Sequence, residues 1–363
     1  MSAPLLDRRT LNRALLQRQL LLERSTAGPL AAVEQLVGLQ GQAPAPPFVG
    51  LWSRVADFRH EQLIELLEQR AVVRATMMRG TIHHVARADL LRFRATLQPV
   101  VDRVLTGGRR PEVAALPDLL PRARALLEAE PRTVTALREP LAAAYPELPA
   151  DDLTMVVRMR LPLAMLPEPE RRYGFPGNAP RLTPIERLVG EPIDPDPRPG
   201  ELLRRYLAAF GPAAAADATR WSGLGATRAL LEAMDDLVRY RDEQGRTLFD
   251  LPGRPLPAAD EPAPTRFLPR FDNLVLAHAD ATRVVADEHR QGLVTKNGIV
   301  AATFLWDGDV AGTWEIERRG ARAVLRLLPF GRLPRAARPA LREEGTALLR
   351  FAEPDAERYA VEG

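Results

Sequence analysis

The 363-residue sequence contains no cysteine and only one lysine, Lys296. The lack of cysteine excludes disulfides, thiolate metal sites and cysteine nucleophiles, and it says nothing about the redox compartment. A mechanism that needs a Schiff-base lysine has Lys296 as its single candidate. The arginine bias is also what a GC-rich genome produces, but guanidinium groups suit phosphate whatever their origin.

Long apolar runs and cofactor motifs are also missing. No stretch approaches 18 uncharged apolar residues, and the first residues lack a basic cap followed by an apolar core. There is no phosphate-loop pattern and no GxGxxG after a predicted strand. The five histidines offer neither a zinc ligand set nor a triad with a carboxylate. We therefore expect a cytoplasmic protein that uses no metal or other cofactor and spans no membrane.

The charge is modest in sum and uneven along the chain. The formal net charge is +3 and the isoelectric point is about 9.6. Arginines concentrate between residues 74 and 110 and again between 318 and 338, whereas the region 235–243 is acidic. Basic faces of this kind bind nucleic acid, although solvated helix faces have a similar composition.

The spacing of apolar residues predicts helices over 7–25, 29–39 and 60–69, followed by short strands at 72–76 and 81–85. Three helices and a hairpin are typical of a winged helix-turn-helix, a DNA-binding unit whose wing is the hairpin. Other small α+β domains share this order of elements. The order then recurs twice, without a strict sequence repeat.

The second group consists of helices at 119–129, 134–144 and 151–160, with extended pieces at 163–166 and 172–175. After a proline-rich linker at 191–200, the third consists of helices at 201–210, 213–221 and 225–234 and a wing at 237–248. Strands are then predicted at 274–277, 291–296, 299–304, 310–317 and 323–329, with Asn-Gly and Asp-Gly turns at 297–298 and 307–308, and a helix at 339–351.

These patterns predict an α+β fold with three tandem winged helix-turn-helix units and a C-terminal antiparallel β-meander or small barrel. The expected domains are residues 1–110, 111–190 and 198–262 for the three winged-helix units and residues 263–363 for the β-rich part with its terminal helix.

Five short strings occur in an order that resembles one family. They are LQGQ at 39–42, GLWSR at 50–54, MRGTIH at 78–83, RWSGL at 220–224 and LPRFDN at 268–273. Together they resemble the AlkZ/YcaQ-like winged-helix DNA glycosylases over nearly the whole chain. The resemblance implies a concave DNA-binding face and excision of bulky or cationic alkylated bases. It also implies unhooking of interstrand crosslinks, in some members as self-resistance to a DNA-alkylating natural product.

In that family the catalytic element is Gln, any residue, then Gln or Asp, which falls here on Gln40 and Gln42. The middle residue is usually aliphatic, so Gly41 is a departure that suggests a looser backbone. A purine alkylated at N7 leaves as a neutral molecule and needs no further protonation, so two amide oxygens that orient a water suffice. Because no lysine lies near this loop, we expect a monofunctional enzyme. The alternative is that both glutamines only cap a helix or brace the loop.

Other candidate contacts to alkylated double-stranded DNA, bound by a monomer, follow the same strings. Arg54 and Arg79 are candidate phosphate ligands, and His83 is either an active-site or DNA-backbone contact or a buried core histidine. Arg270 either binds DNA or belongs to a salt-bridged cluster, and the turn at Lys296 and Asn297 either probes a groove or is a plain hairpin. A non-catalytic winged-helix DNA-binding protein, such as a regulator, remains the competing hypothesis.

Overall fold

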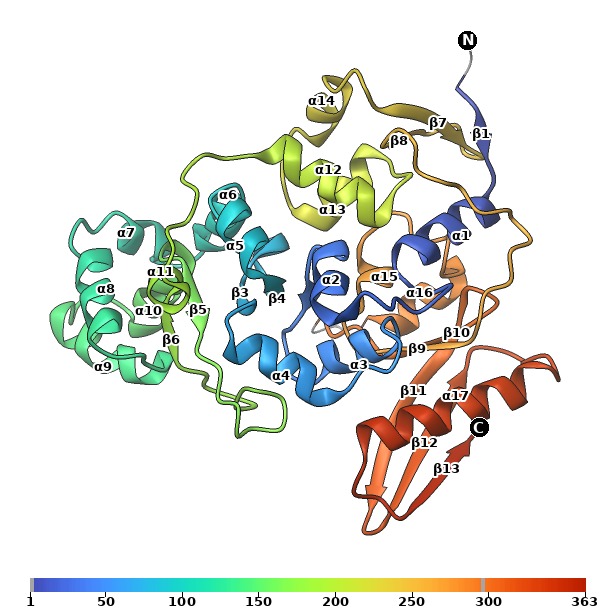
Figure 1. Cartoon of the computed structure of the whole chain (residues 1–363). Coiled ribbons are helices and arrows are strands. Elements are labelled where there is room, and N and C mark those ends of the chain that lie inside the picture. The colour runs from blue at the N-terminus through green and yellow to red at the C-terminus, as the bar shows by residue number, and fades with distance from the viewer. Residues whose placement is uncertain (1–2, 295–297) are drawn as a thin grey trace.

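The computed structural model describes residues 3–294 and 298–363. It has a mixed α+β fold with three small sheets, whose strand orders are β1-β7-β8, β2-β4-β3-β5-β6 and β13-β12-β11-β10-β9 (Figure 1). Among the helices of these residues, none has the length and apolar character that crossing a membrane requires.

The first group of elements contains β1 (Leu5–Leu6), α1 (Arg8–Arg18), α2 (Gly28–Gln35), β2 (Leu39–Gln40), α3 (Pro46–Trp52), α4 (His60–Glu68), β3 (Val72–Thr76), the 3-10 turn η1 (Met78–Gly80), β4 (Ile82–Ala86) and α5 (Arg87–Phe93). The predicted helices and hairpin are present, but the helix expected over 7–25 ends at Arg18, because Leu20 adopts a positive φ angle of 57°. Helix α2 ends earlier than expected because Val37 and Gly38 adopt positive φ angles of 55° and 95°. This early end frees residues 39 and 40 to form β2, which pairs with β4.

The second group contains α6 (Gln98–Asp102), η2 (Arg103–Thr106), α7 (Arg110–Ala114), α8 (Leu119–Ala129), α9 (Val134–Ala144), α10 (Ala150–Arg160), β5 (Leu163–Met165), β6 (Leu182–Pro184) and α11 (Ile185–Val189). The strand expected at 172–175 is wrong, because β5 pairs with β6 instead. Strand β5 also pairs with β3, so one sheet continues across the boundary expected near residue 110.

The third group contains α12 (Pro199–Phe210), α13 (Ala215–Ser222), α14 (Thr227–Glu232), β7 (Val238–Asp242) and β8 (Thr247–Asp250). These elements match the predicted three helices and hairpin. The N-terminal strand β1 joins this hairpin by pairing in parallel with β7.

The C-terminal part contains β9 (Arg266–Leu268), α15 (Asn273–Leu276), α16 (Asp287–Leu293), β10 (Thr303–Trp306), β11 (Asp309–Arg319), β12 (Arg322–Pro329), α17 (Ala337–Ala352) and β13 (Arg358–Glu362). The expected strand at 274–277 is wrong, since α15 occupies this segment. The expected strand at 291–296 is wrong as far as Leu293, where α16 ends, and its residues 295 and 296 lie outside the described residues. Asp272 caps α15 by accepting a hydrogen bond from the Leu274 amide at 2.9 Å. The sheet is mixed and open, because β13 pairs in parallel with β12.

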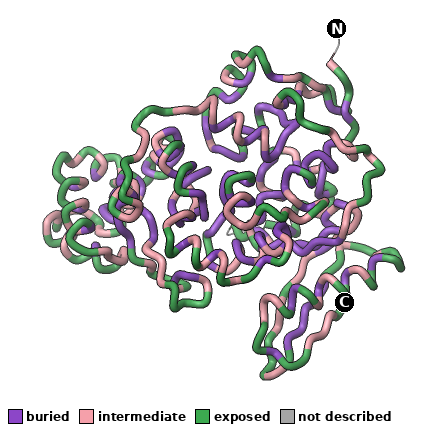
Figure 2. Tube along the Cα trace, in the orientation of Figure 1, coloured by how far each residue is buried: buried purple, intermediate pink, exposed green. Residues whose placement is uncertain are grey.

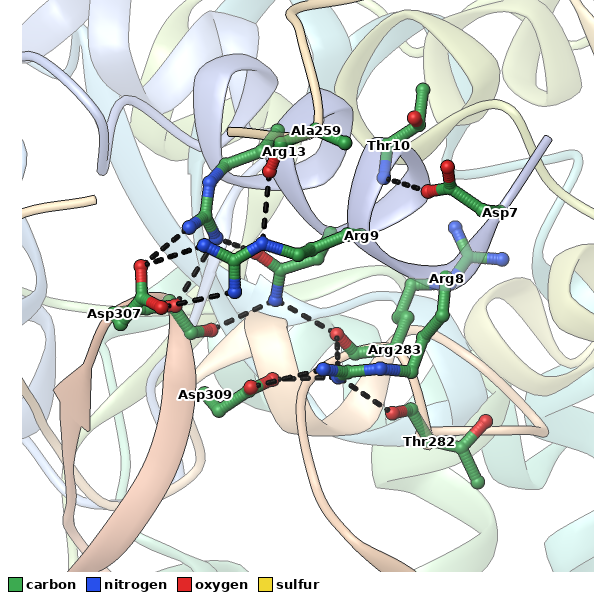
Figure 3. Close-up of polar contacts among 12 residues, drawn as sticks. Asp7, Arg8, Arg9, Thr10, Arg13, Ala259, Thr282, Arg283, Asp307 and Asp309 are labelled. Carbon is green, nitrogen blue, oxygen red and sulfur yellow. Dashed lines mark hydrogen bonds and ion pairs between the residues drawn. The ribbon is translucent and has the colours of Figure 1, made fainter. Parts of the chain in front are cut away.

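Helix α1 fastens the β10–β11 hairpin to the rest of the protein (Figure 3). Arg9 and Arg13 share the carboxylate of Asp307, and Arg8 pairs with Asp309 at 2.7 Å. The predicted Asp-Gly turn is confirmed, with φ angles of 49° at Asp307 and 83° at Gly308. The turn can approach α1 this closely because Gly308 has no side chain: a Cβ there would lie 2.4 Å from Arg13 Nη1.

The largest core joins all parts of the chain. Leu15 of α1, Val73 of β3, Phe210 of α12, Trp221 of α13 and Leu274 of α15 belong to one buried cluster. Figure 2 shows these buried segments running through the interior, while α17 and the outer C-terminal strands carry more exposed positions. This shared core holds the hairpin β3–β4 and helix α13 in fixed relation to one another, and β2 is attached to them by its pairing with β4.

Candidate active site

The two faces of the sheet around β2 have different roles. Gln40 pairs with His83 across the β2–β4 ladder, so these two side chains lie on one face. The neighbouring residues Gly41 and His84 belong to the opposite face, where Arg74 of β3 pairs with His84. The Gln40 face therefore carries the predicted catalytic side chain, and the Arg74 face supports the loop from behind.

Gln40 is held in place by an arginine. Its side chain is only 9% exposed, and its Oε1 accepts a hydrogen bond from Arg79 Nη2 at 2.7 Å. Arg79 also donates from Nη1 to the backbone oxygen of Trp221 at 2.7 Å. Because a guanidinium can only donate, this bond fixes the orientation of the Gln40 amide. The amide oxygen has a second lone pair, so it can still accept a hydrogen bond from a water.

Gln42 is less constrained than Gln40. Its side chain is exposed, and its Oε1 lies 3.4 Å from the Ile82 amide nitrogen, which is a long hydrogen bond. The backbone at this point is better fixed, because the Gly41 amide donates to the Ile82 oxygen at 2.8 Å and extends the pairing of β2 with β4. One glutamine of the pair is thus locked, and the other can turn toward a ligand.

Gly41 makes room for a histidine ring. A Cβ at position 41 would lie 2.4 Å from His84 Nδ1 and 2.9 Å from its Cε1. Arg74 Nε donates to the Gly41 oxygen at 3.0 Å, so both backbone polar groups of Gly41 are hydrogen-bonded. The looser backbone expected from the missing side chain is therefore not found.

Arg74 was missed by sequence reasoning, although a charged residue within an otherwise apolar strand was a usable signal. It is 4% exposed and lies over the Phe175 ring, 4.9 Å from the ring centre. Burial lowers its pKa to about 10. Besides its bond to Gly41, Arg74 donates from Nη2 to the backbone oxygen of Gln42 at 3.4 Å. Its guanidinium therefore braces the backbone of the loop that carries both glutamines.

His83 is a buried, neutral histidine on the Gln40 face. It is 1% exposed, and its Nδ1 lies 3.0 Å from the Thr81 backbone oxygen. A carbonyl can only accept, so Nδ1 carries the ring proton. Burial, together with the nearby positive charge of Arg79, lowers the pKa of His83 to about 3. The ring is therefore uncharged at neutral pH.

The expected phosphate contact by Arg54 needs correction. Its side chain is completely buried, and it forms a two-pronged ion pair with Asp272 at 2.7 and 2.9 Å. It also donates to the backbone oxygens of Gln19 and Gly50. Arg54 thus joins two of the family-like strings internally and does not reach the surface.

Asn273, the neighbour of Asp272, donates from Nδ2 to the Gly38 oxygen at 2.8 Å, directly before β2. Arg79 connects the string at 78–83 to the string at 220–224 in the same way. The separate strings therefore meet around Gln40.

Lys296 and Asn297, the predicted hairpin tip, lie outside the described residues.

Arg270 is exposed and lies on the wall of a cavity of about 390 Å³ next to the glutamine loop. Ala43 and Pro46, just after Gln42, form part of the wall. Aromatic side chains contribute much of the remaining surface, namely Phe48, His60, Tyr173, Trp314 and Phe351. A flat group in this cavity would therefore meet aromatic side chains, with the guanidinium groups of Arg172 and Arg270 at the wall.

Within the described residues, no group of three or more His, Cys, Asp or Glu side chains is placed to hold a metal ion. The polar groups nearest the two glutamines are instead arginines, backbone amides and a neutral histidine. Such a site can orient a water and bind anions, and in the part of the chain that the structure describes neither glutamine side chain is hydrogen-bonded to a carboxylate.

Comparison with known proteins identifies the family of the chain. The interstrand DNA cross-link repair glycosylase of Streptomyces sahachiroi is 32% identical over 139 residues, which cover 35% of this chain and 36% of that protein. The match thus spans about a third of the relative's length. The solved structure of the S. sahachiroi DNA glycosylase AlkZ superposes with a TM-score of 0.77 at 22% identity, covering 98% of both chains, and so shows the same fold. The model of the family described as DNA glycosylase AlkZ-like matches residues 33–351. The chain therefore belongs to the AlkZ-like DNA glycosylase family.

Proposed function

We propose that the protein is a monofunctional DNA glycosylase that hydrolyses the N-glycosidic bond of cationic N7-alkylated purines. The observation that carries the proposal is the pair of glutamines on the braced loop: Gln40 is fixed by Arg79, and Gln42, two residues later, is exposed. Bulky adducts and interstrand crosslinks fall within the same chemistry, and the relative's description as a cross-link repair glycosylase supports their inclusion.

The chemistry asks little of the protein because the lesion is already activated. An N7-alkylated purine carries positive charge and departs neutral, so the remaining tasks are to place a water below C1′ and to tolerate an oxocarbenium-like sugar. The amide oxygen of Gln42 is the freer of the two and aligns that water. The amide oxygen of Gln40 accepts the second hydrogen bond of the same water. A neutral amide is a weak base, so the enzyme is restricted to cationic lesions.

The DNA partner is a lesion-containing duplex bound by a monomer. In this proposal the three groups of helices and hairpins act as tandem winged helices, and Arg79, Arg270, Lys296 and Asn297 contact the DNA. His83 lines the Gln40 face as a neutral polar group. The position of Arg270 on the cavity wall beside the loop supports its assignment.

An associated lyase activity is not part of the proposal. Cleavage of the strand by a lyase needs an amine that attacks C1′, and the only lysine, Lys296, is far from the glutamine loop in the sequence. The expected product is an abasic site in an intact strand.

The test compares two lesions in the same duplex sequence. Purified protein should release 7-methylguanine, a cationic base, and leave hypoxanthine, a neutral base, in place; the strand should break only after alkali treatment. Failure to release any cationic base, combined with tight binding to undamaged duplex, would replace the glycosylase proposal by the non-catalytic DNA-binding alternative.

A further inference from the structure

Three arginines converge on the C-terminal turn of α13, next to Gln40. Arg79 donates to the Trp221 oxygen at 2.7 Å, and Arg103 donates to the Gly223 oxygen at 2.8 Å. Arg220 belongs to the last turn of α13 itself and is exposed. The turn approaches the hairpin tip so closely that a Cβ on Gly223 would lie 3.4 Å from the Arg79 Cα. The three arginines thus come from η1, η2 and α13, and each of them either belongs to this turn or donates to one of its backbone oxygens.

No carboxylate balances this cluster. In the described part of the chain, none of the ion pairs joins Arg79, Arg103 or Arg220 to an acidic side chain. Arg54, which also belongs to one of the family-like strings, is by contrast paired with Asp272. Burial lowers the pKa of Arg79 to about 10, and the nearby positive charge of Arg220 adds to this effect. Such an arrangement is stable only where an anion or the solvent compensates it.

Capping of α13 explains only part of the arrangement. Two of the arginines satisfy terminal carbonyls, and cations at a helix C-terminus interact favourably with the helix dipole. Arg220 makes no such bond, yet it adds a third charge at the same turn. Arg79 also has a left-handed backbone, with φ of 57°, which a non-glycine residue adopts only where its surroundings impose it. Its side chain joins the turn to Gln40 Oε1.

We infer that Arg79, Arg103 and Arg220 form a binding site for one backbone phosphate of the lesion-containing strand, and that Arg79 thereby acts as a positioning residue for Gln40. A phosphodiester is the anion that a DNA glycosylase brings to this face, and guanidinium forks match its oxygens. Because Arg79 donates to both the Trp221 oxygen and Gln40 Oε1, a phosphate bound here keeps the Arg79 guanidinium, and with it the Gln40 amide, in the position that the structure shows. This inference rests on the proposed function for its substrate and concerns the phosphate next to the lesion.

The first experiment measures binding, so it does not depend on base release. The dissociation constant for a duplex containing a stable abasic-site analogue is measured against salt concentration for the wild-type protein, Arg220→Gln and Arg358→Gln. Arg358 is an exposed arginine on β13, far along the chain from the cluster, and controls for the loss of one charge. The slope of log K against log [salt] should fall by about 0.9 for Arg220→Gln and stay unchanged for the control.

The second experiment finds the phosphate. Single neutral methylphosphonate linkages replace the phosphates around the lesion, one position at a time. At one position, the neutral linkage should weaken wild-type binding roughly tenfold and have almost no further effect on Arg220→Gln, because the same contact is already lost. If the two penalties add at every position, or if the salt slope of Arg220→Gln is unchanged, the phosphate site is refuted.

The third experiment separates positioning from binding. Arg79→Lys keeps the charge and loses the fork that reaches both Gln40 and Trp221. It should retain the salt slope and the melting temperature while single-turnover release of 7-methylguanine falls at least about tenfold. Normal release by Arg79→Lys would refute the positioning role, and a parallel loss of melting temperature would assign Arg79 to structure alone. If no protein variant, including wild type, releases a base, the proposed function fails while the binding experiments still decide the phosphate site.

Discussion

Gly41 should be intolerant of any side chain while His84 is present. In Gly41→Ala the new Cβ would lie 2.4 Å from His84 Nδ1, far inside van der Waals contact. The His84 ring is completely buried, and it packs edge-on against Phe175 with 5.7 Å between ring centres, so moving it aside would disrupt this packing. The loop must therefore shift away from β4, and with it the backbone that Arg74 holds.

The size of both effects, on folding stability and on base release, follows from how far the Gly41 loop has to move. Overpacking a closely packed site costs about 1–3 kcal/mol of folding stability. A shift of about 1 Å in a catalytic group costs on the order of 100-fold in rate, so release of 7-methylguanine should fall by about that factor. Single-turnover base release and thermal denaturation measure the two effects separately.

A second substitution controls for simple misfolding. His84→Ala removes the ring and leaves room for the extra methyl group, so the double variant Gly41→Ala/His84→Ala should release base faster than Gly41→Ala alone. The four proteins form a double-mutant cycle whose coupling energy measures the contact between the two positions. Wild-type rate and melting temperature for Gly41→Ala would refute the reasoning, as would penalties that simply add.

Three further predictions concern stability. Arg54→Met leaves the Asp272 carboxylate buried and unpaired and should cost about 3–5 kcal/mol in urea unfolding; a loss below 1 kcal/mol would contradict the buried ion pair. The folded-state pKa values of His83 and His278, about 3, lie below the unfolded value, so the unfolded chain alone gains their protons as the pH falls below about 6.5. The free energy of unfolding should therefore drop by about 2 kcal/mol per histidine between pH 7 and pH 5. If the pH dependence of stability is the same in His278→Gln as in the wild type, protonation of His278 is not its cause. Asp307→Asn weakens the ion pairs that join α1 to the β10–β11 hairpin and should lower the free energy of unfolding, measured by thermal unfolding, by about 1–3 kcal/mol. An unchanged stability would show that these ion pairs do not hold the hairpin to α1.

The sequence predicted helices and hairpins best where local signals agreed. Helices α8, α9 and α12 lie almost where their apolar spacing placed them, and the turn at Asp307 and Gly308 has the expected backbone. The short apolar run of α15 was ambiguous, because four residues are too few to distinguish a buried helix from a strand. Only the cap by Asp272 decides it.

The pairing of distant strands could not be predicted from local patterns. Nothing in residues 163–165 indicates that β5 extends the sheet of β3, or that β13 pairs in parallel with β12. Long-range register depends on how the whole core packs, so local periodicity underdetermines it. This is why the predicted meander lacked its outer strand.

The sequence proposes the two glutamines of the candidate site, but it does not indicate the residues that support them. Gln40 and Gln42 are proposed through the family-like string. Arg54 was expected at the surface because guanidinium groups are rarely buried, yet Asp272, 218 residues away, neutralises it inside the protein. Likewise, the functions of Arg74 and His84 depend on contacts made by β3 and β4 across the sheet.

The central claim is that a water oriented by two neutral amides is sufficient to excise a cationic base. Its most direct test is the single-turnover release of 7-methylguanine by Gln40→Ala/Gln42→Ala, measured together with the affinity for a duplex that carries a stable abasic-site analogue. The account predicts that base release is abolished while DNA affinity and melting temperature stay close to the wild-type values. Release at the wild-type rate would contradict it, and a matching loss of DNA affinity would show that the loop binds DNA and does not act on the glycosidic bond.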